Sequence, residues 1–260
     1  MTSDRLDDAG HAFYSRALAL LERTQKPFLV GGAYAFARYT GIERDTRDFD
    51  VFLRRSDVHD VLSAFAAEGY RSELTFPHWL GKIHEGDRYV DLIFSSGNGV
   101  AVVDDEWFAH AQPSDVIGIP VRLIPVEEMI WSKGFVMERE RYDGADVIHL
   151  IHAQADRIDW LRLMRRYRPY PRVLLAHLLL HGFVFPAERD RVPEPVIREL
   201  WERSLGRPAP AEERLCQGTL ISRLQYLADL AQGYRDARQA PLGGMTREEI
   251  ALWTRAAESG

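Results

Sequence analysis

Residues 30–52 read VGGAYAFARYTGIERDTRDFDVF, and this block decides the fold. It follows a short apolar run, PFLV, that ends at Gly31 and Gly32, which indicates a strand entering a tight turn. The segment AYAFARYTG predicts a short helix ended by Gly41. In the segment DFDVFLR, residues 48–54, Phe49, Val51 and Leu53 would lie on one face and Asp48, Asp50 and Phe52 on the other, which predicts a strand. The block therefore predicts a strand, a turn, a helix and a second strand.

Two carboxylates leave this second strand on one side. Asp48 and Asp50 are two residues apart, and side chains with that spacing lie on the same face of a strand. Carboxylates this close repel each other unless a cation lies between them, so the pair is a candidate site for a hard divalent ion. Asp91 interrupts the apolar run VDLIF, and if its strand lies beside residues 48–54, three carboxylates converge. Such a cluster can hold two metal ions during a displacement at phosphorus.

Each feature also has an ordinary explanation when taken alone. An Asp-x-Asp pair is common on half-exposed strands, and Asp91 could pair with Arg88. The glycine pair favours the metal interpretation, because backbone N–H groups in such a turn, and the helix N-terminus after it, can approach a phosphate closely. Arg44, Thr46 and Arg47 stand in the same block. The arginines could offset carboxylate repulsion or contact phosphate, or they could be solvated surface residues.

The first half of the chain continues to alternate between helices and strands. Helices are predicted at 56–67, at 104–111 and from Pro125 through Lys133 towards Glu140. Strands are predicted at 70–74, in a hairpin over 78–96 that turns at Glu85-Gly86-Asp87, and in a pair over 116–123. From about Asp156 only helical periodicity remains, at 156–167, 170–184, 193–205, 215–232 and 246–257. Thr246 and Glu249 fit a capping box. We expect an α/β (α+β) fold, with a mixed sheet flanked by helices over residues 1–155 and an all-helical unit over 156–260.

Composition narrows the class of protein. The 260 residues are 46% hydrophobic and 28% charged, which is ordinary for a globular chain. The net charge of −6 gives no general attraction to nucleic acid, so a polyanionic partner must meet a local basic patch. Cys216 is alone, the start MTSDRLDDAG lacks a signal-peptide pattern, and no apolar run is long enough to span a membrane. We expect a soluble, cytoplasmic protein without a membrane partner.

Other polar residues have weaker patterns. The run RLMRRYRPYPR, residues 162–172, holds five arginines and two tyrosines, a composition that contacts phosphates and unpaired bases but also occurs on solvated helix faces. The side chains of the first hairpin arm could border a nucleotide or pack across strands: His78, Trp79, Lys82 and His84. Four histidines lack acidic or cysteine ligands at suitable spacing, and we expect structural roles for them: His149, His152, His177 and His181.

The block 30–52 resembles the active-site signature of the DNA polymerase β-like nucleotidyltransferase superfamily, and VDLIF looks like the strand that supplies its third carboxylate. The heptad from Arg44 to Asp50 is similar to that of minimal bacterial nucleotidyltransferases, which include toxins of type IV toxin–antitoxin systems. The resemblance covers about residues 27–152. Lys133, Asp143 and Asp146 match the helical lysine and the later aspartates of the toxin-type members, whereas Tyr142 and Val147 depart from their pattern.

The resemblance implies a nucleotidyltransferase-type sheet and a magnesium-dependent transfer of NMP from an NTP to a hydroxyl acceptor, with release of pyrophosphate. The implied catalytic residues are Asp48, Asp50, Asp91 and Lys133, of which the three aspartates hold two Mg²⁺ ions. The implied nucleotide-binding residues are Gly31, Gly32, Arg44, Thr46 and Lys133. Lys133 suits a triphosphate because an ammonium is a compact positive charge.

The identity of the acceptor stays open at this point. A tRNA or other RNA end, a protein hydroxyl and a hydroxylated small molecule all fit, and the NTP and the oligomeric state are equally open. The toxin-type resemblance implies an antitoxin protein as a partner. The alternatives are a catalytically silent NTP-binding sensor or toxin–antitoxin interaction module, and a helical adaptor, which would leave residues 31–50 unexplained.

Overall fold

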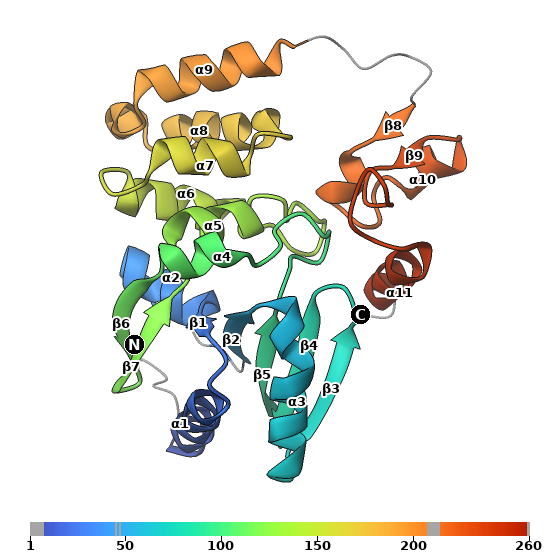
Figure 1. Ribbon diagram of the computed structural model, residues 1–260. Coiled ribbons are helices and arrows are strands. Elements are labelled where there is room, and N and C mark those ends of the chain that lie inside the picture. Colours follow the sequence, from blue (N-terminus) through green and yellow to red (C-terminus); the bar gives the residue numbers. More distant parts are fainter. Residues whose placement is uncertain (1–7, 45, 47, 207–213, 259–260) are drawn as a thin grey trace. The chain divides into compact units, whose positions relative to one another are not determined.

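A seven-stranded mixed sheet forms the centre of the first of two compact units in the computed structural model (Figure 1). The structure describes residues 8–44, 46, 48–206 and 214–258. The strand order is β3-β4-β5-β2-β1-β7-β6. The strands are β1 (Phe28–Val30), β2 (Asp48–Leu53), β3 (Arg71–Phe76), β4 (Leu80–Glu85), β5 (Arg88–Ile93), β6 (Gln112–Val116) and β7 (Ile119–Leu123). The predicted mixed sheet flanked by helices is confirmed.

The helices predicted in this unit after the glycine turn, at 56–67 and at 104–111 are confirmed. The helices of the unit are α1 (Asp8–Arg23), α2 (Gly32–Thr40), α3 (Val58–Ala67), which follows a 3₁₀ turn over Arg55–Asp57, and α4 (Asp105–Ala109). Gly41 ends α2 with φ +72°, a conformation that glycine adopts without strain. Asp104 caps α4 by accepting a hydrogen bond from the Glu106 amide. Helix α3 packs on β3 and β4 (Figure 1).

Strand β2 separates an apolar face from a polar one. Phe49, Val51 and Leu53 are fully buried, while Asp48 and Asp50 on the other face are half-buried. Phe52 shares the aspartate face but stacks on Trp107 of α4, with ring centroids 5.4 Å apart. The predicted alternation is confirmed, and burial of the apolar face holds the two carboxylates in place.

The second unit is mainly helical. Its helices are α5 (Val126–Lys133), α6 (Gly144–Gln154), α7 (Trp160–Arg166), α8 (Pro171–Val184), α9 (Glu194–Ser204), α10 (Leu227–Ala231) and α11 (Arg247–Glu258), with 3₁₀ turns at Pro186–Arg191 and Gly218–Leu220. The capping box of α11 is confirmed, because the Thr246 amide donates to Glu249 Oε2 at 2.8 Å and the Glu249 amide to Thr246 Oγ1 at 3.2 Å. None of the helices in the described ranges is long and apolar enough to cross a membrane.

Two helix predictions for this unit are wrong. The segment 215–232 begins with strand β8 (Leu215–Cys216), which pairs in parallel with β9 (Arg235–Asp236), so the unit is not all-helical. At Gly218 a Cβ would lie 2.4 Å from the Tyr226 ring, a close approach that a continuous helix would not make. Helix α5 ends at Lys133 and does not continue towards Glu140, because Met137 pairs with Tyr142 in an antiparallel bridge instead.

A buried ion network joins α5 to α7. Arg162 Nη1 lies 2.6 and 2.9 Å from the two oxygens of Glu128, and its Nη2 donates to Glu127. Arg166 Nε donates to Glu128 Oε1 at 2.9 Å. Arg162 is 3% exposed and Glu128 is 0% exposed. Arg162 and Arg166, two of the five arginines in residues 162–172, therefore have structural partners.

The two compact units are Met1–Pro125 and Val126–Gly260, whereas the sequence places the domain boundary at residue 155. The physical reason for the difference is that α5 and α6 pack on α7 and α8, so their apolar faces are buried within the helical unit. The functional extent of a catalytic domain over residues 1–155 stays a prediction.

Candidate active site

Strands β2 and β5 bring three carboxylates together. They are parallel neighbours whose register sets Asp50 opposite Asp91. One carboxylate oxygen from each of Asp48, Asp50 and Asp91 lies within 4.8 Å of the others, and no other group of three acidic, histidine or cysteine side chains in the described ranges is so placed. Asp91 is 8% exposed. Three hard oxygen donors at this spacing fit a divalent cation such as Mg²⁺.

Lys82 contacts this cluster from the neighbouring strand. It lies opposite Asp91 in the pairing of β4 with β5, and its Nζ donates to Asp91 Oδ1 at 2.7 Å. The same ammonium is 3.7 Å from the centroid of the Tyr89 ring. Burial raises the pKa of Asp91, and the charge of Lys82 opposes that rise. The sequence places Lys82 only at the border of the site, because it does not reveal the strand register.

The other side chains of the first hairpin arm have structural partners. A ring nitrogen of His78, Nε2, lies 3.0 Å from the Gly97 carbonyl oxygen. Trp79 stacks on Phe76, with centroids 5.8 Å apart. His84 lies 3.3 Å from Glu73. These contacts favour the packing role that the sequence left open.

The glycine turn lies directly against the carboxylates. The Gly31 amide donates to the Asp50 carbonyl oxygen at 2.9 Å, and Gly32 has φ +55°. A Cβ on Gly32 would lie 1.7 Å from Asp50 Oδ2, so no larger residue fits without displacing that carboxylate. Helix α2 begins at Gly32 with Gly31 as its N-cap, so no cap side chain covers its first amides. Backbone donors and carboxylates thus face one another at the start of α2.

Thr46 and Arg44 flank the first aspartate in different ways. The Thr46 hydroxyl donates to Asp48 Oδ1, and the Asp48 amide donates to Thr46 Oγ1 at 3.4 Å. This pair of bonds orients Asp48. The Arg44 guanidinium stacks on Phe36 of α2, with its carbon 4.4 Å from the ring centroid. Arg47 lies outside the described residues.

Two tyrosines that the sequence analysis missed pack beside Asp48. The rings of Tyr14 and Tyr34 lie 5.1 and 4.9 Å from that of Phe49. Burial, followed by the charge of Asp48, raises the pKa of Tyr34 to about 12. Burial also raises the pKa of Tyr14. Both hydroxyls stay protonated at neutral pH. For Tyr34, the sequence signal that it lies near the site is its position two residues after Gly32. Tyr14 gives no such signal, because it lies in an amphipathic helix as many core aromatic residues do.

Lys133, Asp143 and Asp146 meet within the second unit. Lys133 Nζ donates to Asp143 Oδ2 at 3.0 Å and to Asp146 Oδ2 at 2.8 Å. Arg141 adds two bonds of 2.9 Å to Asp143. Burial raises the pKa of Asp143, but Arg141 and Lys133 outweigh it and hold that pKa below its usual range. The two aspartates therefore fix the lysine ammonium, while its contact with a nucleotide stays a prediction.

Two of the predicted structural histidines pack in the second unit. His177 is fully buried, with Nε2 2.8 Å from the Gly134 carbonyl oxygen. His152 stacks on Phe185, with centroids 3.9 Å apart. Within the described ranges, the histidines form no group of metal-binding spacing.

Comparisons with known proteins give only distant similarities. No protein-family model and no curated protein matches the sequence. Among solved structures, the chain is similar to the antibiotic-resistance factor ANT(2'')-Ia, with 17% identity, 76% of this chain and 94% of that chain covered, and a TM-score of 0.41. It is also similar to the lincosamide antibiotic adenylyltransferase LnuA, bound to lincomycin, with 18% sequence identity and a TM-score of 0.40. This match covers 56% of this chain and 98% of that chain. A third similar structure is JHP933 from Helicobacter pylori, with 12% sequence identity and a TM-score of 0.39. The match covers 77% of this chain and 97% of that chain. These identities and TM-scores are low, so the functional conclusion depends on the site itself.

Proposed function

We propose that this protein is a magnesium-dependent nucleotidyltransferase, which transfers NMP from an NTP to a hydroxyl group and releases pyrophosphate. The observation that carries the proposal is the convergence of Asp48, Asp50 and Asp91 beside the glycine turn of α2. Carboxylates gathered beside a helix N-terminus that no cap side chain covers form a site for both a cation and a phosphate.

The three aspartates would hold two Mg²⁺ ions, which would supply neutralisation of the charge that develops on the phosphate oxygens. Gly32 and the first amides of α2 bind phosphate oxygens, and Gly31 holds this turn beside the carboxylates through its bond to the Asp50 carbonyl oxygen. Lys133 remains a proposed contact of the triphosphate because it matches the helical lysine of the toxin-type pattern, and within its own unit Asp143 and Asp146 hold its ammonium. Most of the rate enhancement then comes from positioning and charge complementarity.

Asp91 accepts the proton of the acceptor hydroxyl. The hydroxyl oxygen forms a bond to the α-phosphorus, and the bond from that phosphorus to the bridging oxygen of the pyrophosphate breaks. Lys82 holds the Asp91 carboxylate in place during this step through its 2.7 Å bond to Oδ1. Thr46 does the same for Asp48. Arg44 remains a proposed nucleotide contact from its place in the block 30–52.

The test is a labelling experiment with purified protein, Mg²⁺, each α-³²P-labelled NTP and a total cell extract. Label is then followed into RNA, including tRNA, into protein and into small molecules. We expect label in one of these fractions, which names the acceptor class. The variant Asp48→Asn/Asp50→Asn should abolish transfer.

A matched control removes the same charge from exposed positions of the first unit. Asp60→Asn/Asp87→Asn changes two carboxylates whose side chains are 64% and 72% exposed. This control should transfer label at the wild-type rate. Full activity of Asp48→Asn/Asp50→Asn would exclude the proposed site. No transfer to any fraction by the wild type, with NTP bound, would instead identify a silent nucleotide sensor.

A further inference from the structure

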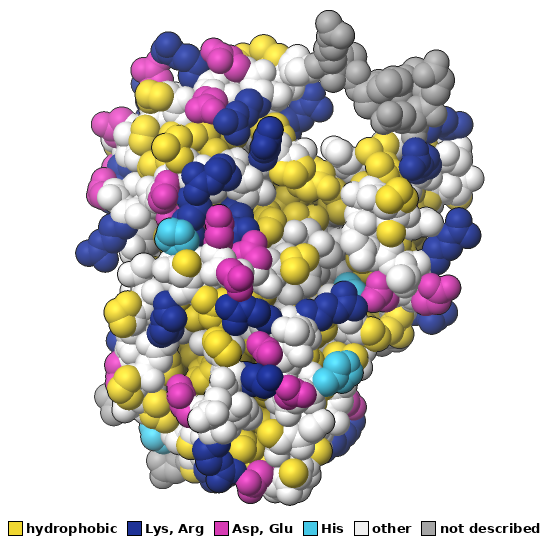
Figure 2. All heavy atoms as spheres, viewed as in Figure 1, with side chains coloured by type: hydrophobic (Ala, Val, Ile, Leu, Met, Phe, Trp, Pro, Cys, Tyr) yellow, Lys and Arg dark blue, Asp and Glu magenta, His cyan; other side chains and the backbone are white. Residues whose placement is uncertain are grey.

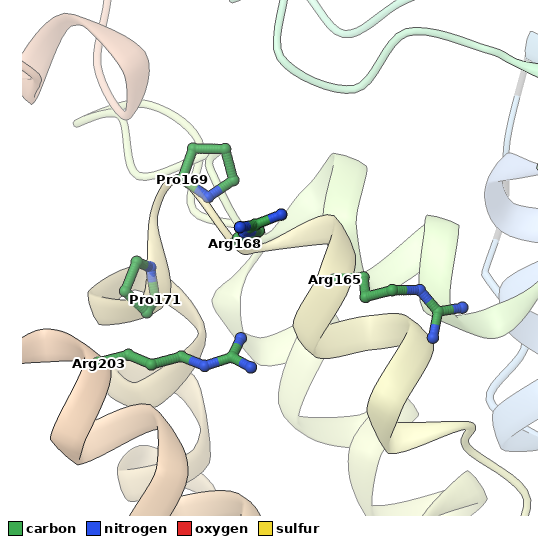
Figure 3. A pocket seen from close by; sticks show the side chains of 5 residues that line it. All are labelled: Arg165, Arg168, Pro169, Pro171 and Arg203. Carbon is green, nitrogen blue, oxygen red and sulfur yellow. The ribbon is translucent and has the colours of Figure 1, made fainter.

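Three arginines line a hollow in the second unit that the proposed reaction does not use (Figure 3). Arg165 comes from α7, Arg168 from the turn after it, and Arg203 from α9; Pro169 and Pro171 complete the lining. The hollow has a volume of about 610 Å³. We call it the arginine pocket. Figure 2 shows Lys and Arg side chains over the region of α7 to α9, with Asp and Glu side chains among them.

Carboxylates of the described residues compensate the charge of this pocket only in part. Of the five arginines in residues 162–172, Arg162 and Arg166 are neutralised by the buried glutamates of α5. Arg165 and Arg168 are exposed, and no carboxylate in the described part of the chain pairs with either. Arg203 is paired with Glu199 one turn earlier on α9. Like charges around one hollow repel each other, so the pocket favours an anion.

Overall composition does not explain this local excess of positive charge. The chain as a whole carries a net charge of −6, so a hollow lined by three arginines and by no carboxylate does not follow from its overall charge. A basic concave surface on an acidic protein focuses the electrostatic potential towards an anionic ligand. Arginine in particular offers a planar set of donors that suits phosphate oxygens.

The pocket is built on fixed elements. The Arg172 guanidinium, at the start of α8, donates to the Ser204 carbonyl oxygen at 2.7 Å. This bond holds the end of α9, and with it Arg203, against the segment that carries the two prolines. Pro169 and Pro171 restrict the backbone of that segment. The arginines therefore project from a scaffold that needs little reordering when a ligand binds.

A second hollow of about 380 Å³ adjoins the arginine pocket and shares Pro169, Pro171 and Arg203 with it. Its lining adds aromatic and aliphatic side chains, among them Phe135, Tyr170 and Leu220. The Tyr170 ring is half-buried and meets Phe135 edge-on, with centroids 5.5 Å apart. An aromatic surface next to a phosphate site suits an unpaired base joined to its phosphate.

We propose that the arginine pocket and the adjoining hollow bind single-stranded nucleic acid, with phosphates at Arg165, Arg168 and Arg203 and a base against Tyr170. The phosphodiester and the unpaired base are common to RNA and DNA. This binding does not depend on the transfer reaction, because it uses no residue of the carboxylate cluster and no NTP.

The experiment measures fluorescence anisotropy of a labelled twelve-nucleotide oligouridine and of the matching oligothymidine with the full chain in EDTA, without NTP. The variant Arg165→Gln/Arg168→Gln is compared with Arg189→Gln/Arg198→Gln, which removes two exposed arginines of the same unit outside both hollows. We expect the pocket variant to bind about tenfold more weakly or worse, and the slope of log affinity against log salt to fall by about 1.4, that is about 0.7 for each lost phosphate contact. The control variant should bind like the wild type. Tyr170→Leu should weaken binding by about fivefold or more.

Binding of both oligonucleotides would support recognition of the strand, and preference for oligouridine would add a contact to the 2′-hydroxyl group. No binding by the wild type would overturn the proposal. Equal weakening in the pocket and control variants would also overturn it, since the effect would then be general electrostatics. Displacement of the oligonucleotide by inorganic phosphate at the oligonucleotide's own affinity would identify a small-anion site instead.

Discussion

Gly32 joins the backbone of the phosphate turn to the carboxylate cluster. Its φ of +55° costs an L-residue about 1–2 kcal/mol, and a Cβ there would displace the Asp50 carboxylate. Gly32→Ala should therefore lower transfer by about 100-fold or more, because small displacements of catalytic groups have effects of that size. Thermal unfolding and the labelled transfer assay measure the two effects.

Gly41→Ala is the matched control for this prediction. Gly41 has φ +72°, and nothing lies within 4 Å of where its Cβ would be. It should lose similar stability and keep its activity. If both variants transferred label equally well, the close contact between Gly32 and Asp50 would have no role in the reaction.

Lys82 opposes the rise that burial causes in the pKa of Asp91, so its loss should change how stability depends on pH. In metal-free Lys82→Met the pKa of Asp91, which burial already raises above its ordinary value, should rise further. A carboxyl whose folded-state pKa is raised contributes stability below its unfolded pKa and loses it as pH rises through the folded value. The unfolding free energy of Lys82→Met should thus fall more steeply than that of the wild type from about pH 4 upwards, as urea denaturation can measure.

The double variant Lys82→Met/Asp91→Asn provides the control, because it lacks the titrating group. Its pH dependence above about pH 4 should be flatter than that of Lys82→Met. Parallel curves for the wild type and Lys82→Met would show that Lys82 does not influence Asp91.

At the scale of elements, the link between α5 and α7 depends on the buried ion network. Arg162→Met leaves Glu127 and Glu128 with fewer partners in a dry environment, and should cost about 3–5 kcal/mol of unfolding free energy. Arg198→Met removes an exposed arginine paired with Glu194 on α9, and should change stability little. Chemical denaturation distinguishes them, and equal stabilities would contradict a structural role for the network.

The elements also show what a sequence can predict. Local signals sufficed for α2, whose glycine ends it, for the hairpin over 78–96 and for the capping box of α11. They failed over 215–232, where helical periodicity competes with pairing of β8 to the distant β9. They also could not place Lys82 on Asp91, because strand register depends on partners far apart in the chain.

At the scale of the whole molecule, the sequence predicted three converging carboxylates because two of them share a strand face and the third interrupts an apolar strand. It could not predict that β5 pairs in parallel with β2, which brings Asp91 opposite Asp50. Nor could it predict that α5 and α6 belong with the later helices, since their packing partners are separated from them by loops. Residue types and their spacing along one strand therefore predict a group of carboxylates more readily than they predict where one compact unit ends and the next begins.

The central claim is that Asp48, Asp50 and Asp91 form one divalent-cation site that acts with NTP. The most direct measurement is a titration with Mn²⁺ in place of Mg²⁺, in which electron paramagnetic resonance counts the ions bound per chain in the presence of NTP. We predict that the wild type and Asp87→Asn bind two ions and that Asp48→Asn/Asp50→Asn binds none at the same Mn²⁺ concentration. An unchanged number of bound ions in Asp48→Asn/Asp50→Asn would contradict the claim.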